Sequence, residues 1–162
     1  MFSIHKATID DIPLIRELTF RVWPQTYTGA ISSDQIDYML EMMYNESSLK
    51  KQFENGCRFI FVYENEEPVG FASYQEITPK EWKLHKIYVL ISQQGKGTGK
   101  FVINHIIDEI RKQGARSLEL QVNRNNKAKG FYEKLGFSEN RQVKIDIGSG
   151  YFMDDYIMKK II

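Results

Sequence analysis

The sequence is poor in cysteine and in net charge, and it has no long apolar run. Its one cysteine among 162 residues, Cys57, excludes an intrachain disulfide framework and favours a reducing compartment, so we expect the cytoplasm. The net charge of +1 lacks the basic excess of a general nucleic-acid or membrane-surface binder. Residues 1–6 lack the apolar core of a signal peptide, and no stretch of about 18 apolar residues occurs. We therefore expect no nucleic-acid partner and no membrane partner.

Linkers, internal repeats and low-complexity tracts are absent as well. A chain of this length buries about two-thirds of its unfolded surface, so residues 1–162 are predicted to form a single domain. Cys57 itself has two interpretations. Its neighbour Arg58 would lower the pKa of the thiol, whereas a lone cysteine that enters a strand is more often a small buried apolar residue.

The periodicity of apolar residues predicts a mixed order of strands and helices. Thr8 and Ser32 each begin a helix-capping pattern, and Trp23-Pro24 predicts the end of the first helix, because proline disfavours helix in the residue before it. The predicted helices cover residues 10–23, 32–43, 47–54, 101–113 and 126–135. The predicted strands cover residues 2–7, 58–63, 69–76, 82–90, 117–122, 139–147 and 151–159.

Residues 93–100 read Gln-Gln-Gly-Lys-Gly-Thr-Gly-Lys and connect a predicted strand to a predicted helix. The first amides of a helix lack intrahelical partners, and glycines let the backbone approach a ligand. This glycine turn therefore predicts a site for a phosphate anion. Two nucleotide motifs do not fit it. A Walker A loop would need glycine at Gln94 and Ser or Thr at Phe101, and a dinucleotide fingerprint would need glycine at Lys100.

Two segments resemble the signatures of the GNAT acetyltransferases. Residues 94–99 match Arg/Gln-x-x-Gly-x-Gly/Ala, and residues 122–137 match Asn-x-x-Ala followed by Tyr and Gly-Phe. The matching residues of the second segment are Asn125, Ala128, Tyr132, Gly136 and Phe137. The resemblance implies an α/β (α+β) fold: a mixed, mostly antiparallel sheet of about seven strands, four or five flanking helices, and a splay between strands 4 and 5. Residues 130–137 and 153–158 are also similar to the bacterial spermidine/spermine N-acetyltransferase branch.

The same resemblance implies acetyl-CoA as cosubstrate and no metal. In the family the fourth strand binds the pantetheine arm through its backbone, which here is Ile87, Tyr88 and Val89. Asn125 is expected to help hold the cofactor. Lys96 or Lys100 would add a charge-assisted contact to the phosphates, with solvation at the surface as the alternative, and Lys86 extends the local basic patch. The pyrophosphate is expected on the backbone of Gln94, Gly95, Lys96, Gly97, Thr98, Gly99 and Lys100.

Tyr132 is the predicted general acid. The family uses a tyrosine at this position to protonate the leaving thiolate of CoA, and a phenol with a pKa of about 10 is a competent donor. The alternative is a core position against the sheet. The general base must deprotonate an ammonium with a pKa of about 10.4. His85 and Glu76 are the candidates, with Glu81 or a water chain as alternatives. Cys57 lies outside both motifs, which favours direct attack in a ternary complex over an acyl-enzyme.

The acceptor is expected to be a primary amine, either a polyamine or another small amine. Residues 22–49 contain no Lys or Arg but several acids and aromatic rings. This composition fits a polycation site, and it fits equally an amphipathic helix with a solvated acidic face. A peptide or protein amine, favoured by a long acidic groove, and a non-catalytic acyl-CoA sensor remain alternatives. The protein is expected to be a monomer or a homodimer, the latter formed through the C-terminal strands.

Overall fold

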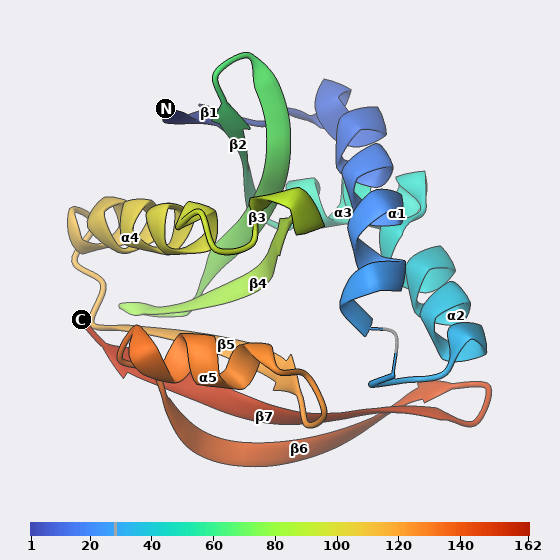
Figure 1. Ribbon diagram of the computed structural model, residues 1–162. Helices are drawn as coiled ribbons and strands as arrows, with labels where there is room; N and C mark the ends of the chain where they lie inside the picture. The colour runs from blue at the N-terminus through green and yellow to red at the C-terminus, as the bar shows by residue number, and fades with distance from the viewer. Residues whose placement is uncertain (28) are drawn as a thin grey trace.

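The computed structural model describes residues 1–27 and 29–162 and contains a seven-stranded sheet flanked by helices (Figure 1). The strand order is β1-β2-β3-β4-β5-β7-β6, and every neighbouring pair is antiparallel except β4 and β5. The predicted mixed, mostly antiparallel fold is therefore confirmed.

The strands are β1 (Phe2–Lys6), β2 (Arg58–Glu64), β3 (Glu67–Thr78), β4 (Glu81–Val89), β5 (Ser117–Asn123), β6 (Ser138–Gly148) and β7 (Tyr151–Ile161). The helices are α1 (Ile12–Tyr27), α2 (Ser33–Tyr44), α3 (Glu46–Glu54), α4 (Thr98–Arg111) and α5 (Ala128–Lys134), with 3-10 turns at Ile9–Asp11 and Ile91–Gln93.

Helices cover both faces of the sheet, and each face has its own apolar core (Figure 1). α4 and α5 pack on one face, where Ile106 on α4 and Leu118 on β5 are fully buried. α1, α2 and α3 pack on the other face over a core that includes Leu18 and Phe71. Burial of each such side chain stabilises the fold by about 1.5–3 kcal/mol. Each helix in the described part of the chain is too short or too polar to cross a lipid bilayer.

The first helix departs from the sequence prediction at its C-terminal end. Thr8 forms the predicted capping box, but α1 then continues through Pro24 to Tyr27. A proline inside a helix removes one backbone donor from the hydrogen-bond ladder. The last turn persists because it brings aromatic rings together: the ring centroids of Trp23 and Tyr27 are 4.6 Å apart, and those of Trp23 and Tyr88 are 5.7 Å apart. Tertiary packing here outweighs the local proline signal.

The sheet opens between β4 and β5, as predicted. β4 pairs with β5 only over residues 81–84, and the rest of β4 pairs with β3 alone. The β3 pairing also skips His85, which stands between the paired residues Leu84 and Lys86 as a β-bulge. An extra residue reverses the alternation of side chains along a strand, so His85 and Lys86 face the same side of the sheet. That side is the one covered by α1 and α2.

The β6–β7 hairpin extends beneath α2, at the lower right of Figure 1. The Tyr38 hydroxyl on α2 donates to the carbonyl of Ile147 at 2.6 Å, and Gln35 Nε2 donates to the carbonyl of Phe152 at 2.7 Å. Ser32 caps α2 as predicted by accepting from the Gln35 amide, but the Gln35 side chain reaches the hairpin instead of the cap. These bonds attach α2 to the C-terminal strands and bound the space between them.

Candidate active site

The glycine turn leads directly into α4, which begins at Thr98 and so includes part of the predicted loop. Gly95 and Gly97 both have a φ of +81°, in the left-handed region that glycine adopts without strain. Thr98 is buried, and its hydroxyl donates to Oε1 of the buried Gln93 at 2.9 Å. This bond ties the turn to the helix and explains the early helix start. Gln93 was not singled out from the sequence, because a buried glutamine in a loop has no periodic signature.

The turn presents backbone donors toward open space. Gly97 is the N-cap of α4 and offers no side-chain cap, and the first amides of the helix have no intrahelical carbonyl partner. A Cβ atom added at Gly95 or Gly97 would meet no described atom within 4 Å, so the backbone is accessible there. The helix dipole adds positive potential at the same end. This arrangement suits a phosphate group.

Gly99 has a different role, because it lets α5 pack closely against the start of α4. A Cβ atom at Gly99 would lie 3.1 Å from Cζ of Phe131, tighter than an ordinary contact. Phe131 is the chain neighbour of Tyr132, and their ring centroids are 5.3 Å apart. The two segments that carry the motifs are therefore in direct contact, and the glycine turn and Tyr132 belong to one site.

The end of β4 runs between this turn and the splay. Ile87, Tyr88 and Val89 pair with β3 on one side and lie beyond the β5 pairing on the other. Ile87 and Val89 pack toward the core under α4, whereas Tyr88 packs toward α1. A strand edge that has lost its neighbour offers backbone donors and acceptors to an extended ligand. This edge is continuous with the glycine turn.

The lysines near the turn are not all directed to it. Lys96 Nζ lies 3.5 Å from Glu64 Oε1, and Lys100 is exposed. Lys86 does not join them: it lines a cavity on the α1–α2 side of the sheet. The predicted single basic patch is therefore divided between two places. The bulge at His85 that turns Lys86 into the cavity has no recognisable sequence signal.

The cavity has a volume of about 240 Å³ and lies between α1, α2 and the splayed strands. Its polar and charged residues come mainly from the sheet: Lys83, His85, Lys86, Gln121, Asn123 and Asp155. Its apolar and aromatic residues come mainly from the helices: Trp23, Tyr27, Ile31, Met39, Met43 and Tyr44, with Tyr88 and Met153 from the strands. Pockets that hold drug-sized ligands usually measure about 300–1,000 Å³. The cavity therefore suits a smaller molecule.

A cluster of tyrosines joins this cavity to the glycine turn. The hydroxyls of Tyr27 and Tyr88 are 3.0 Å apart, and burial raises the pKa of both phenols well above the usual value. Tyr132 is buried on α5, and burial raises its pKa as well. Tyr132 is also close enough to raise the pKa of Tyr27 and of Tyr88 further. The Tyr132 phenol therefore stays neutral throughout the physiological pH range.

His85 lines the cavity as a neutral imidazole. Burial, with the charges of Lys83 and Lys86, lowers its pKa to about 4. His85 Nε2 lies 3.0 Å from Gln75 Oε1, and the Gln75 amide nitrogen donates to the carbonyl of Asn55 at 2.6 Å. Since Gln75 Oε1 is an acceptor, His85 donates through Nε2–H and keeps its lone pair on Nδ1.

The other titratable candidates do not enter the cavity. Glu76 is exposed near the end of β3, where its carboxylate accepts from the amide of Lys80 in the β3–β4 turn at 3.1 Å. Glu81 pairs with Lys159 at 3.2 Å. Cys57 donates its thiol to Gln75 Oε1 at 3.4 Å, and burial raises its pKa, opposite to the lowering that Arg58 would give. Cys57 therefore matches the structural interpretation.

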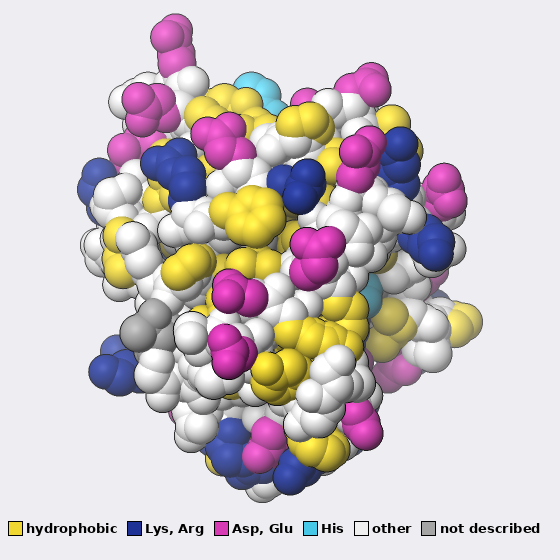
Figure 2. All heavy atoms as spheres, turned by 90° about the vertical axis from the view of Figure 1, so that its right-hand side faces the viewer, with side chains coloured by type: hydrophobic (Ala, Val, Ile, Leu, Met, Phe, Trp, Pro, Cys, Tyr) yellow, Lys and Arg dark blue, Asp and Glu magenta, His cyan; other side chains and the backbone are white. Residues whose placement is uncertain are grey.

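Asn125 and the acidic segment lie at the rim of the site. Asn125 is exposed. Its backbone N–H donates to Asn123 Oδ1 at 2.9 Å, and its side-chain Nδ2 donates to the carbonyl of Ala30 at 3.5 Å. The acids of residues 22–49 do not line the cavity and are exposed on the outer surface: Asp34, Asp37, Glu41 and Glu46. Figure 2 shows Asp and Glu side chains spread among apolar ones on the face that α1 and α2 cover. This matches a solvated acidic face.

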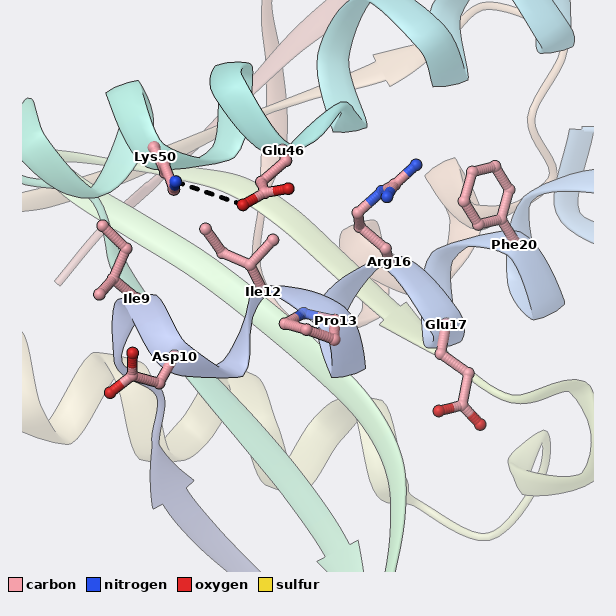
Figure 3. Close-up of a pocket in the computed structure, with 9 residues that line it drawn as sticks. All are labelled: Ile9, Asp10, Ile12, Pro13, Arg16, Glu17, Phe20, Glu46 and Lys50. Atoms are coloured by element: carbon pink, nitrogen blue, oxygen red, sulfur yellow. Dashed lines mark ion pairs between the residues drawn. The ribbon is translucent and has the colours of Figure 1, made fainter.

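A larger and shallower groove of about 770 Å³ lies apart from the motifs, along the outer side of α1 and α3 (Figure 3). Its lining includes Arg16, Phe20 and the ion pair of Lys50 with Glu46 at 3.2 Å. None of the predicted site residues lines it. Size alone would select this groove, but the splayed strands β4 and β5 and the buried phenols of Tyr27 and Tyr88 line the smaller cavity. In the described part of the chain, no group of three His, Cys, Asp or Glu residues could hold a metal ion.

The chain is similar to known acetyltransferases. The sequence profile of the acetyltransferase (GNAT) family matches residues 15–137, which include the glycine turn and Tyr132. Over 98% of the chain, the sequence is 25% identical to spermidine N(1)-acetyltransferase of Thermoplasma acidophilum and covers 96% of it. The crystal structure of a PaiA N-acetyltransferase from Thermoplasma acidophilum in complex with coenzyme A has the same fold, with a TM-score of 0.82, 23% identity, and coverage of 100% of this chain and 99% of that one.

A second relative matches a shorter stretch. The chain is 35% identical over 89 residues to the [ribosomal protein bS18]-alanine N-acetyltransferase of Haemophilus influenzae. That match spans 55% of this chain and 57% of the relative's length.

Proposed function

The chain belongs to the acetyltransferase (GNAT) family, and from this premise we propose that it transfers the acetyl group of acetyl-CoA to a small primary amine. The observation that carries the proposal is the continuity of one path: the glycine turn, the free edge of β4, the buried Tyr132 and the cavity beneath α1 and α2 follow one another. Each part of that path has a task in acyl transfer.

The donor is held mainly by backbone. The first amides of α4 and the left-handed glycines Gly95 and Gly97 receive the pyrophosphate, supported by the other residues from Gln94 to Lys100. The pantetheine arm adds to the open edge of β4 at residues 87–89, as a peptide adds to a sheet edge. Asn125 contacts the cofactor from the rim, and the thioester lies at the splay, next to Tyr132.

Tyr132 acts as the general acid. The neutral amine attacks the thioester carbonyl carbon and forms the C–N bond. When the intermediate collapses, the C–S bond breaks and Tyr132 transfers its phenolic proton to the sulfur, so the leaving group departs as a thiol. Its raised pKa keeps the phenol protonated throughout the physiological pH range. The phenolate then regains a proton from solvent.

His85 receives the proton that the attacking amine loses. It lines the cavity with a neutral ring, and its Nδ1 lone pair is available because Nε2 is engaged by Gln75. With a pKa of about 4, the imidazole relays the proton to water and does not retain it. Glu76 lies near the end of β3, outside the cavity, and is not part of this proposal.

The acceptor is proposed to be small because the cavity is small and its roof is formed by α1 and α2. A polyamine is one candidate suggested by resemblance, since the full-length relative from Thermoplasma acidophilum is named for spermidine and Asp155 supplies a carboxylate in the cavity. The amino terminus of a protein is another, since the Haemophilus influenzae relative is named for the alanine of a ribosomal protein.

The Tyr132→Phe variant tests this function and separates an enzyme from a sensor. Removal of the phenolic proton should lower kcat about 100-fold or more, because general acid catalysis contributes about 10²–10⁴. The dissociation constant for CoA should stay within about twofold, since the ring remains. CoA-thiol release against a panel of amines gives kcat, and calorimetry gives the affinity for CoA.

Tyr63→Phe is the matched control, because it removes a phenolic hydroxyl from β2, outside both motifs and the cavity lining. Full turnover by Tyr132→Phe would contradict the assignment of the acid. Tight acetyl-CoA binding by the native chain without turnover of any amine would support the sensor.

A further inference from the structure

The charges in the cavity are unequally compensated. Lys83 Nζ donates to Gln121 Oε1 at 3.5 Å, and Gln121 Nε2 donates to Asp155 Oδ2 at 2.7 Å. Gln121 thus links one cation to one carboxylate, and Lys83 lowers the otherwise raised pKa of Asp155. This chain of three side chains is nearly neutral as a unit. It leaves Lys86 as the remaining cation of the lining.

Lys86 has no carboxylate within ion-pair distance among the described residues. Its ammonium lies 5.0 Å from the ring centroid of Tyr44, an attractive cation–π contact. The titratable groups that act on it are Cys57 and Lys83, and neither carries negative charge at neutral pH. Burial, the largest cause, lowers the pKa of Lys86 to about 8, so it is still mostly charged at pH 7. A cation held in this way can gain a full charge-assisted bond from an anion.

We propose that the acceptor carries an anionic group next to its amine and that Lys86 binds this group. This inference rests on the proposed function and names its substrate class: a carboxylate-bearing amine of amino-acid size. Polyamines have no anionic group for Lys86 to bind, and their ammonium groups would be repelled by the Lys86 ammonium.

The dimensions and polarity of the cavity support an amino-acid-like molecule. Lys86 and Tyr88 are two residues apart on β4, and both line the cavity of about 240 Å³. A group bound by Lys86 and an amine beside Tyr88 would therefore share one small space. Asp155 lines the same cavity and acts electrostatically on Tyr27, and so can attract the ammonium as it enters. Met39, Met43 and Met153 provide an apolar wall for a side chain.

The test compares acceptors that differ only in the anion. CoA-thiol release is measured with leucine, with 3-methylbutylamine (which lacks the carboxylate), with leucinamide, with the phosphonate analogue of leucine and with spermidine. A second pair, phenylalanine and 2-phenylethylamine, covers a larger side chain. Because these amines differ in their own pKa, the deciding quantity is how the ratio of kcat/KM within a pair changes between protein variants.

Lys86→Met removes the charge and keeps the length of the side chain, and Lys51→Met on the exposed side of α3 is its control. Within each pair, the ratio of kcat/KM for the amino acid to kcat/KM for the amine that lacks the carboxylate measures the preference. We expect this ratio to fall at least tenfold in Lys86→Met and to be unchanged in Lys51→Met. An equal fall for the phosphonate would show that Lys86 binds any anion, and a smaller fall would show preference for a carboxylate. Both outcomes support the inference. A ratio that survives Lys86→Met, or a native preference for spermidine or leucinamide, would overturn it.

A binding measurement keeps this result separate from the proposed function. Calorimetry with N-acetylleucine in the presence of CoA requires no turnover. A tenfold or greater loss of affinity in Lys86→Met supports the anion site, whether or not any amine is acetylated. If no amine is acetylated, the proposed function is wrong but the anion site is still supported. Equal affinity in the native chain and in Lys86→Met would overturn the anion site, even if amines are acetylated.

Discussion

The two ends of the site are built in different ways. The donor end consists of backbone from one continuous stretch, residues 87–100, held by a few glycines and by the start of α4. The acceptor end consists of side chains from three helices and three strands that meet across the splay. Backbone recognition tolerates many sequences but needs particular dihedral angles, whereas side-chain recognition depends on which residues the topology brings together. The donor end should therefore be sensitive to conformation and the acceptor end to charge.

The largest effect on CoA binding is expected at the donor end, from Gly97→Ala. Its φ of +81° is strained for alanine, and the added methyl group would stand where the pyrophosphate approaches, although it meets no described protein atom within 4 Å. We expect CoA to bind about 10–100-fold more weakly, which corresponds to about 1.4–2.8 kcal/mol. Calorimetric titration with CoA measures this change.

Gly114→Ala provides a matched control for this substitution. Gly114 has a φ of +82°, follows the other end of α4, and a Cβ there also meets no described atom within 4 Å. Both variants should lose about 1–2 kcal/mol of stability through the backbone strain. Only Gly97→Ala should bind CoA more weakly. If the two variants affect CoA binding equally, the glycine turn is not the phosphate site.

The same contrast explains what the sequence could predict. The family, the fold, acetyl-CoA as cosubstrate and the splay follow from two motifs and from element order, and these predictions are confirmed. The donor-site residues remain predictions, and the structure places them together at the glycine turn and the β4 edge. These features are local: a strand, a glycine turn and a helix start are contiguous in the chain, so their spacing is visible in the sequence.

The acceptor end could not be predicted in the same way. Lys86 faces the cavity only because the β4 bulge skips His85, and Asp155 and Gln121 meet only because β5 pairs with β7. Trp23-Pro24 predicted a helix end that aromatic packing overrides. The acids of residues 22–49 suggested a polycation site by composition, but they point to solvent. Each of these outcomes depends on contacts between residues distant in the sequence.

Lys86→Met should reveal the cost of the buried charge in the absence of any ligand. The pKa of Lys86 falls from 10.5 to about 8 on folding, so below pH 8 the folded protein holds a proton at a cost. Between pH 8 and 10.5 the unfolded chain binds the extra proton, and the stability of the native chain rises with pH. We expect Lys86→Met to be more stable by about 1–2 kcal/mol at pH 7 and this advantage to shrink toward pH 10. Urea denaturation of both proteins at several pH values measures the difference.

Lys51→Met again serves as the control, because Lys51 is exposed and its charge stays solvated in the folded protein. Removing that charge therefore relieves no desolvation penalty. Its stability relative to the native chain should be flat from pH 7 to pH 10. A flat difference for Lys86→Met as well would mean that the ammonium reaches water and needs no anion.

The smallest effect is expected from Glu64→Gln, which tests whether side chains matter at all at the donor end. Lys96 Nζ lies 3.5 Å from Glu64 Oε1, and the two side chains are 51% and 30% exposed, so the pair is weak and its removal leaves Lys96 available to the phosphates. We expect CoA to bind about two- to threefold more tightly at low salt, with the gain lost at high salt. Glu109→Gln breaks a pair with the same 3.5 Å separation at the far end of α4 and should leave CoA affinity unchanged. Weaker binding by Glu64→Gln would instead show that Glu64, through its 3.4 Å contact with Gln93, holds the glycine turn in shape. In that case the donor end would depend on a side-chain network as well as on its backbone.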